Sequence, residues 1–328
     1  EGYKMKAIQV NSFGDPDVMK LGEMDDPIPS EGEILVKVSG AGVNPVDTTF
    51  RSGAHPLSKG LKLPWVPGID AAGEVISVGE GVQNFKEGDR VFGSSVSGGY
   101  AELSLLNAHR SAILPDNFDF IQGASFPCVL YTAYYALVYK ASIKPGETIL
   151  IHGGAGGVGS MAIQIAKATG ATVFSTVSSQ EKAEFCKDLG ADLVFNYREQ
   201  DWVSECLKET SGRGVDSIIE MVASENFDLD CQAIKKFGTI VLLGSGTGKN
   251  PSGTVTYPPF YSKDIDVRGM SLFNSDCFFS SMTSQLEVLL KNEKIRSVVG
   301  EIVDLADAPR SHEILMTGSV FGKIVLSV

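Results

Sequence analysis

A glycine-rich stretch at residues 153–159 constrains the fold of this chain more than any other feature. It stands between the apolar, β-rich run 148–152 and the helix-like segment 160–168. Glycines permit a tight turn and let the backbone approach a ligand without a Cβ clash. The helix after such a turn offers free N–H groups and the positive end of its dipole to phosphates. Alone the stretch would be weak evidence, but in this context it predicts a dinucleotide-binding turn.

Strand-like and helix-like segments alternate after this turn. Such alternation indicates βαβ units and a parallel, doubly wound sheet. A polar loop at 245–259 ends the pattern. The predicted strands lie at 172–177, 193–197, 216–222 and 239–243, and the predicted helices at 180–189, 201–209 and 229–236.

The two ends of the chain have a different pattern. Short strands joined by Gly and Pro turns fill the first third and predict a compact, mostly β domain. These strands lie at 6–10, 33–38 and 71–79, and residues 86–92 form a turn followed by a short strand. The C-terminal part adds strands at 265–271 and 322–328 and a helix at 284–292.

Composition limits the classes of function. A chain of 328 residues is longer than one core usually supports, so we expect two domains. The net charge of −12 argues against nucleic acid or an anionic membrane as a partner. No apolar run approaches the length of a membrane span, and the start does not resemble a secretory signal. Five cysteines without a CxxC pair predict free thiols and a cytoplasmic location.

The end of the second predicted strand distinguishes NADP from NAD. An acidic residue there would bind the ribose 2′-hydroxyl and repel a 2′-phosphate. The segment 176–182 has no carboxylate at the expected point, and its Ser178, Ser179 and Lys182 suit a phosphate. We expect Glu181 to face solvent from the next helix. The predicted cofactor is therefore NADPH.

The segment 146–159, continuing to Gln164 and Lys167, resembles the signature of the quinone oxidoreductase/zeta-crystallin group of the medium-chain dehydrogenase/reductase family. The resemblance implies an α/β chain with a GroES-like, mostly β domain at 1–124 and 266–328. A Rossmann domain at 125–265 would bind NADPH. Further matching segments lie at 42–47, 51–53, 98–102, 132–134, 196–199 and 322–326.

The resemblance also implies which residues line the cofactor. Ala155, Gly156, Gly157 and Val158 would hold the pyrophosphate. Ser178, Lys182 and Tyr197 would surround the 2′-phosphate and adenosine. The nucleotide cleft would contain Asn226, Leu243, Gly244, Ser245 and Gly246, and the nicotinamide end would contain Met270, Ser271, Leu272, Asn44, Thr132 and Lys323. Core packing remains an equal alternative for Leu243 and Met270.

Zinc-dependent members of the family carry ligands that this sequence lacks. Asn44 stands where the first cysteine ligand would be, and Gly68-Ile69-Asp70 replaces a Gly-His-Glu motif. Only Cys128 falls at a ligand position, and one thiolate cannot form a three-ligand catalytic site. The four-cysteine structural lobe is also missing. We therefore predict no zinc, which argues against simple alcohol oxidation.

The predicted function is NADPH-dependent reduction of quinones by metal-free hydride transfer. Two alternatives stay open: a reductase of α,β-unsaturated carbonyls, and a non-catalytic NADPH-binding structural or RNA-binding protein. Asn44 or Thr132 would hydrogen-bond a substrate oxygen, and no catalytic acid is assigned. Tyr100 and Tyr134 are candidate proton donors, although a core or rim position suits each better. The resemblance implies a homodimer or homotetramer. As a separate hypothesis, the strand at 265–271 pairs across a two-fold axis.

Overall fold

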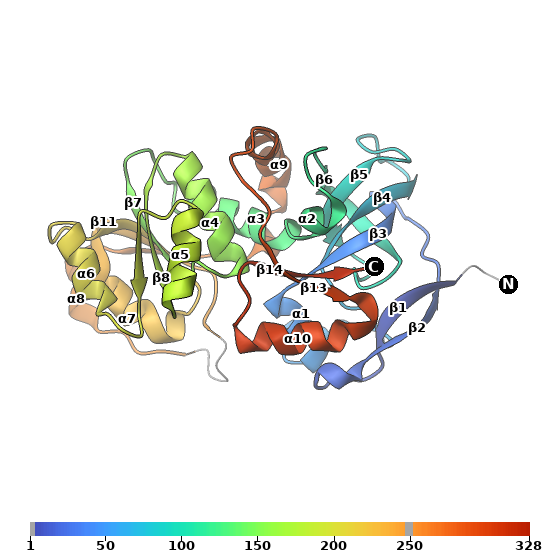
Figure 1. Ribbon diagram of the computed structural model, residues 1–328, viewed down its shortest axis with the longest axis horizontal. Coiled ribbons are helices and arrows are strands. Elements are labelled where there is room, and N and C mark those ends of the chain that lie inside the picture. The colour runs from blue at the N-terminus through green and yellow to red at the C-terminus, as the bar shows by residue number, and fades with distance from the viewer. Residues whose placement is uncertain (1–3, 247–251) are drawn as a thin grey trace. The chain divides into compact units, whose positions relative to one another are not determined.

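The computed structural model describes residues 4–246 and 252–328, and the chain divides into two compact units (Figure 1). Unit 1 comprises Glu1–Val129, Asp276–Lys291 and Arg296–Val328. Unit 2 comprises Leu130–Ser275 and Asn292–Ile295. Within the described ranges, no helix has the length and apolar character that crossing a membrane requires.

Unit 2 contains a six-stranded sheet in the order β12-β11-β10-β7-β8-β9, with every neighbouring pair parallel. Helices α4 to α7 pack against it, as Figure 1 shows for α4 and α5 beside β7 and β8. The predicted Rossmann-type sheet is confirmed. Its strands are β7 Thr148–His152, β8 Thr172–Val177, β9 Leu193–Asn196, β10 Val215–Glu220, β11 Ile234–Leu242 and β12 Asp266–Gly269. Its helices are α3 Pro127–Tyr134, which begins in unit 1, α4 Gly157–Ala168, α5 Gln180–Asp188, α6 Trp202–Glu209, α7 Ala223–Ala233 and α8 Tyr257–Ser262.

Burial explains the composition of these strands. Both faces of a parallel sheet are covered, so its strands are rich in buried apolar residues. Every residue of β7 and of β10 is buried. Apolar side chains of β7, β8 and β10 form the core with α6 and α7, around Leu150, Phe174, Ile218 and Trp202.

Unit 1 is mostly β, as predicted. Strand β3 pairs with both β4 and β6, and β5 pairs with both β4 and β6, so four antiparallel strands close into a small barrel. Strands β14 and β13 extend this sheet beside β3, and β1 pairs with β2. The strands are β1 Lys4–Val10, β2 Met19–Asp25, β3 Glu33–Val43, β4 Asp70–Val78, β5 Arg90–Ser95, β6 Leu103–Ile113, β13 Val299–Asp304 and β14 Lys323–Ser327. The helices are α1 Pro45–Ser52, α2 Phe120–Ala124, α9 Asp276–Lys291 and α10 Ala308–Thr317.

The structure corrects several predicted boundaries. Helix α4 begins at Gly157 rather than at 160, so Gly159 lies in its first turn. The helix predicted at 229–236 lies earlier, and residues from Ile234 onward belong to β11. The helix predicted at 284–292 is the second half of α9. The predicted loop 245–259 includes the start of α8, and its residues 247–251 lie outside the described ranges.

The compact units also differ from the predicted domain limits. The first junction falls at Leu130 rather than at 125. Strand β12 pairs with β11, so residues up to Ser275 lie in unit 2 rather than joining the β domain at 266. The strand itself was predicted at 265–271, but its pairing with β11 was not, because a polar loop separates the two strands in the chain.

Candidate functional site

The predicted nucleotide contacts of unit 2 follow the carboxyl ends of its strands. Because all six strands are parallel, these ends meet at one edge of the sheet, where ligands of such folds bind. The topology thus brings together residues that are spread over more than a hundred positions. They are Ala155, Gly156, Gly157 and Val158 after β7, Ser178 and Lys182 after β8, Tyr197 after β9, Asn226 after β10, Leu243, Gly244, Ser245 and Gly246 after β11, and Met270, Ser271 and Leu272 after β12.

The glycine-rich turn before α4 is held by close backbone contacts. Gly153 has φ +62°, a conformation that favours glycine. Gly156 is exposed and precedes α4 in extended conformation, with no side-chain cap on the helix. A Cβ on Gly159 would lie 2.3 Å from the Gly153 carbonyl oxygen, so the helix and turn pack at backbone distance. The uncapped N–H groups of α4 are therefore available to a pyrophosphate.

The residues after β8 form a small polar group. Lys182 Nζ donates to Ser178 Oγ at 3.3 Å, and both residues are half-buried. Ser179 caps α5, where its hydroxyl accepts from the Lys182 backbone N–H. This helix-capping role limits what Ser179 can offer a ligand. Glu181 is exposed in the first turn of α5, as expected.

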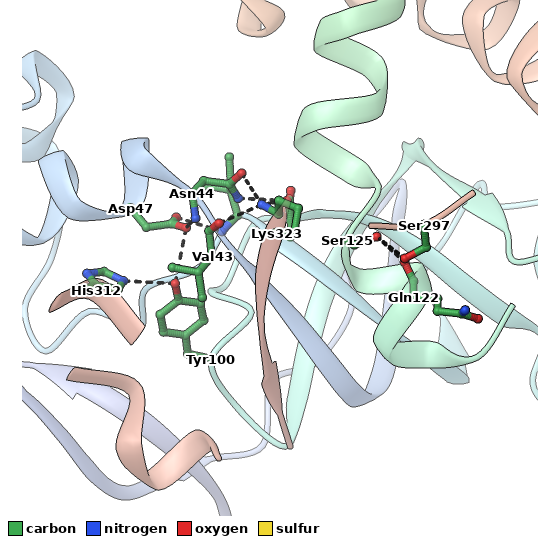
Figure 2. A network of polar contacts seen from close by, with 11 residues as sticks. Val43, Asn44, Asp47, Tyr100, Gln122, Ser125, Ser297, His312 and Lys323 are labelled. Atoms are coloured by element: carbon green, nitrogen blue, oxygen red, sulfur yellow. Dashed lines mark hydrogen bonds and ion pairs between the residues drawn. The ribbon is translucent and has the colours of Figure 1, made fainter. Parts of the chain in front are cut away.

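In unit 1 the structure brings Asn44 and Lys323 together (Figure 2). Lys323 Nζ donates to Val43 O at 2.8 Å and to Asn44 Oδ1 at 2.6 Å, and lies 3.5 Å from Asp70 Oδ2. Asn44 Nδ2 donates to the same Asp70 oxygen at 2.8 Å. Lys323 is 3% exposed and Asp70 is 1% exposed. The ammonium group is therefore a buried cation, held by an amide, a carbonyl and a carboxylate.

A second group of polar residues extends from Asn44. The Asn44 backbone N–H donates to Asp47 Oδ2, which also accepts a hydrogen bond from the Tyr100 hydroxyl (Figure 2). Tyr100 Oη lies 3.1 Å from His312 Nε2. Burial, with the charge of Asp70 adding to it, raises the pKa of Asp47 to about 7. Burial also lowers the pKa of His312 to about 3.

The candidate proton donors lie in the core. Tyr100 is fully buried, and burial raises the pKa of its hydroxyl well above the ordinary value. Tyr134 is 7% exposed, and burial raises its pKa as well. Thr132 is half-buried in α3 of unit 2. A core position therefore suits both tyrosines better than proton donation.

Sequence reasoning missed Asp47, Asp70 and His312 as members of this polar group. Asp47 follows Asn44 by three positions, and the two form a reciprocal capping box on α1. That spacing was visible in the sequence. The contact of Tyr100 with His312 joins residues 212 positions apart and left no local signal.

Comparison with known proteins identifies the family. Residues 30–116 match the alcohol dehydrogenase GroES-like domain, and residues 157–287 match the zinc-binding dehydrogenase family. Quinone oxidoreductase of Sus scrofa is 39% identical over 328 residues, covering 98% of this chain and 97% of its own. A mycobacterial protein complexed with NADPH is 35% identical with a TM-score of 0.89, and an NAD-dependent alcohol dehydrogenase is 29% identical with a TM-score of 0.90. Each of these two comparisons covers 99% of this chain and 100% of the other.

The chain belongs to the medium-chain dehydrogenase/reductase family of oxidoreductases. Within this family it groups with the quinone oxidoreductases, which confirms the predicted resemblance.

The zinc of this family does not fit the residues present. Ile69 offers no ligand atom, and the Asn44 and Asp70 side chains already hold the Lys323 ammonium. Cys128 offers one thiol, and one thiolate cannot form a three-ligand catalytic site. A second positive charge beside a buried ammonium would be repelled at close range. No step is therefore assigned to a zinc ion.

Proposed function

We propose that this protein is an NADPH-dependent reductase of quinones that works without a metal ion. The polar group after β8 is the main support for NADPH over NADH. There Lys182 contacts Ser178, and no carboxylate occupies the strand end. A 2′-phosphate is attracted by this cation, whereas a carboxylate in the same place would repel it. The mycobacterial relative complexed with NADPH supports the proposal.

The chain's own residues would bind and orient the cofactor. The N–H groups at the start of α4 bind the pyrophosphate, and Lys182 with Ser178 binds the 2′-phosphate. Tyr197 is 50% exposed at the end of β9, and its ring offers a face to the adenine. When bound, the nicotinamide supplies the hydride.

The Asn44 and Lys323 group is suited to an electron-poor substrate. A quinone needs less polarisation than a ketone does, so a metal Lewis acid is dispensable. Asn44 Nδ2 gives one hydrogen to Asp70, and we assign its second hydrogen to a substrate oxygen. Lys323, bound to Asn44 Oδ1, holds the amide in that orientation.

Cofactor choice is tested by binding NADPH and NADH to wild type, Lys182→Ala and Lys187→Ala. The loss of Lys182 should weaken NADPH binding about tenfold, which corresponds to about 1.4 kcal/mol, and should leave NADH binding unchanged. Lys187 lies exposed in the last turn of the same helix and serves as the control. Wild-type preference for NADH would contradict the proposal.

Substrate class is tested by steady-state kinetics with quinones and enones of matched size. A higher kcat/KM for the quinones supports the proposal. Preference for the enones would reassign the protein to reduction of α,β-unsaturated carbonyls. Tight NADPH binding without turnover of either would indicate a non-catalytic role, and salt-dependent RNA binding would then identify the RNA-binding version.

A further inference from the structure

Four polar side chains are buried together at the carboxyl ends of three strands of unit 2. His152, Thr176, Glu220 and Asp230 are each at most 2% exposed. His152 Nε2 lies 2.8 Å from Asp230 Oδ1 and 3.4 Å from Glu220 Oε2. His152 Nδ1 lies 2.8 Å from Thr176 Oγ1. One imidazole ring thus joins residues from three other elements.

The distances describe a hydrogen-bonded group rather than a metal site. The His152, Glu220 and Asp230 ligand atoms all lie within 4.8 Å of one another, as an ion would require. A tetrahedral ion with ligand bonds of about 2.0–2.2 Å keeps its ligand atoms about 3.3 Å or more apart. His152 and Asp230 are closer than that and bond directly.

Protonation is consistent with this geometry. Burial lowers the pKa of His152, so the ring is neutral and carries one N–H, which we assign to Nε2 facing Asp230. Burial raises the pKa of Glu220 to about 8 and that of Asp230 to about 7. Glu220 Oε2 and Asp230 Oδ2 accept no hydrogen bond from a donor among the described residues. A proton shared between the two carboxyl groups satisfies both oxygens.

Each strand that contributes to this group leads directly into a nucleotide-binding segment. His152 ends β7 and precedes the glycine-rich turn. Thr176 is its register partner on β8, two positions before Ser178. Glu220 ends β10, accepts a hydrogen bond from the Val222 backbone N–H, and through its carbonyl accepts from Leu243 N at 2.9 Å.

The fourth member comes from a helix. Asp230 lies on α7, the helix that carries Asn226. His152 therefore connects α7 to the ends of β7 and β8 through its hydrogen bonds to Asp230 and Thr176. The Glu220 carbonyl connects the end of β10 to the segment after β11.

We propose that His152 is a positioning residue for the dinucleotide, which fixes the relative placement of the turn after β7, the segment after β8 and helix α7. The nature of the ligand rests on the proposed function. His152 itself touches no cofactor in this scheme. It acts through the backbone that it holds, because phosphate contacts from several loops require those loops to be in register.

The experiment compares His152→Phe with Asp216→Asn in the full-length protein. Asp216 accepts a hydrogen bond from Thr148 N and contacts Lys235 and Arg213 at the amino ends of the same strands, away from the nucleotide segments. We expect His152→Phe to raise the Kd and KM for NADPH about tenfold, with kcat at saturating NADPH nearly unchanged. Asp216→Asn should lower Tm but leave both nucleotide constants as in wild type.

Two further variants keep the test decisive. Thr176→Val removes one bond to His152 while preserving side-chain volume, and it should raise Kd even if His152→Phe does not fold. His152→Asn retains an amide able to bond Thr176 and should recover part of the affinity. A Kd within about twofold of wild type in the folded variants, or equal losses in Asp216→Asn, would overturn the inference.

The wild-type control separates the two proposals. Wild type that prefers NADH would contradict the NADPH assignment, but the positioning role would still be tested with NADH. Wild type that binds NADPH, together with variants that bind it equally well, would overturn the positioning role alone. Failure of wild type to bind either nucleotide would overturn both.

Discussion

At the scale of single residues, buried carboxyl groups make the stability of unit 1 depend on pH. Burial raises the pKa of Asp47 to about 7, whereas an unfolded Asp titrates near about 4. The folded state therefore keeps the proton that the unfolded state releases. The stabilisation from this group is complete below about pH 4 and is lost as pH rises through about 7.

Asp47→Asn tests this pH dependence. Between about pH 5 and 7, wild type should lose up to about 1.4 kcal/mol of unfolding free energy per pH unit through Asp47, and the variant should lose that much less. The amide will cost a constant amount, because it provides one acceptor fewer for Asn44 N, Ile69 N and Tyr100. Urea unfolding at a series of pH values measures the slopes. Parallel slopes would show that Asp47 ionises normally.

Phe237 provides a second prediction at this scale. It has φ +58° and is 74% exposed in the irregular part of β11. A bulky residue in left-handed conformation is strained, whereas glycine is not. Phe237→Gly should therefore stabilise the protein by about 1 kcal/mol, measured by thermal unfolding. A lower Tm would show that the ring makes contacts worth more than the strain.

At the scale of elements, the glycine-rich turn has little room for change. A Cβ at Gly159 would meet the Gly153 carbonyl oxygen at 2.3 Å, and backbone cannot yield as a flexible side chain can. Gly159→Ala should cost about 1–3 kcal/mol of stability and weaken NADPH binding. Gly60→Ala, where a Cβ meets nothing within 4 Å, is the control. Unchanged NADPH affinity in a folded Gly159→Ala protein would refute this role.

The elements also show what the sequence could and could not reveal. Strand and helix alternate locally in unit 2, so its parallel sheet was predictable. The barrel of unit 1 was not, because β3 pairs with β4, β6 and β14, which are far apart in the chain. His152 was missed because it ends an apolar strand, and its partners Thr176 and Asp230 are 24 and 78 positions away. Lys323 was predicted only through the family resemblance.

At the scale of the whole molecule, β12 lies at the end of the strand order in the described sheet of unit 2. An edge strand presents unpaired backbone groups to another chain. We expect β12 to pair with its copy across a two-fold axis, which gives a homodimer, and a homotetramer would need a second interface. Light scattering should give a multiple of the 35.0 kDa chain mass. Val267→Pro should shift the measured mass toward that of a monomer. A monomeric wild type would contradict this prediction.

The metal-free reduction of a quinone by NADPH is the central claim, and one measurement tests it most directly. NADPH oxidation is followed with 1,4-benzoquinone as acceptor, before and after exhaustive treatment with a chelator, with metal content measured on the same sample. Asn44 stands where zinc-dependent members of the family have a zinc ligand, and its Oδ1 already accepts a hydrogen bond from Lys323 Nζ. We therefore predict turnover that survives metal removal unchanged. Activity that disappears with the chelator and returns on adding zinc would contradict the claim.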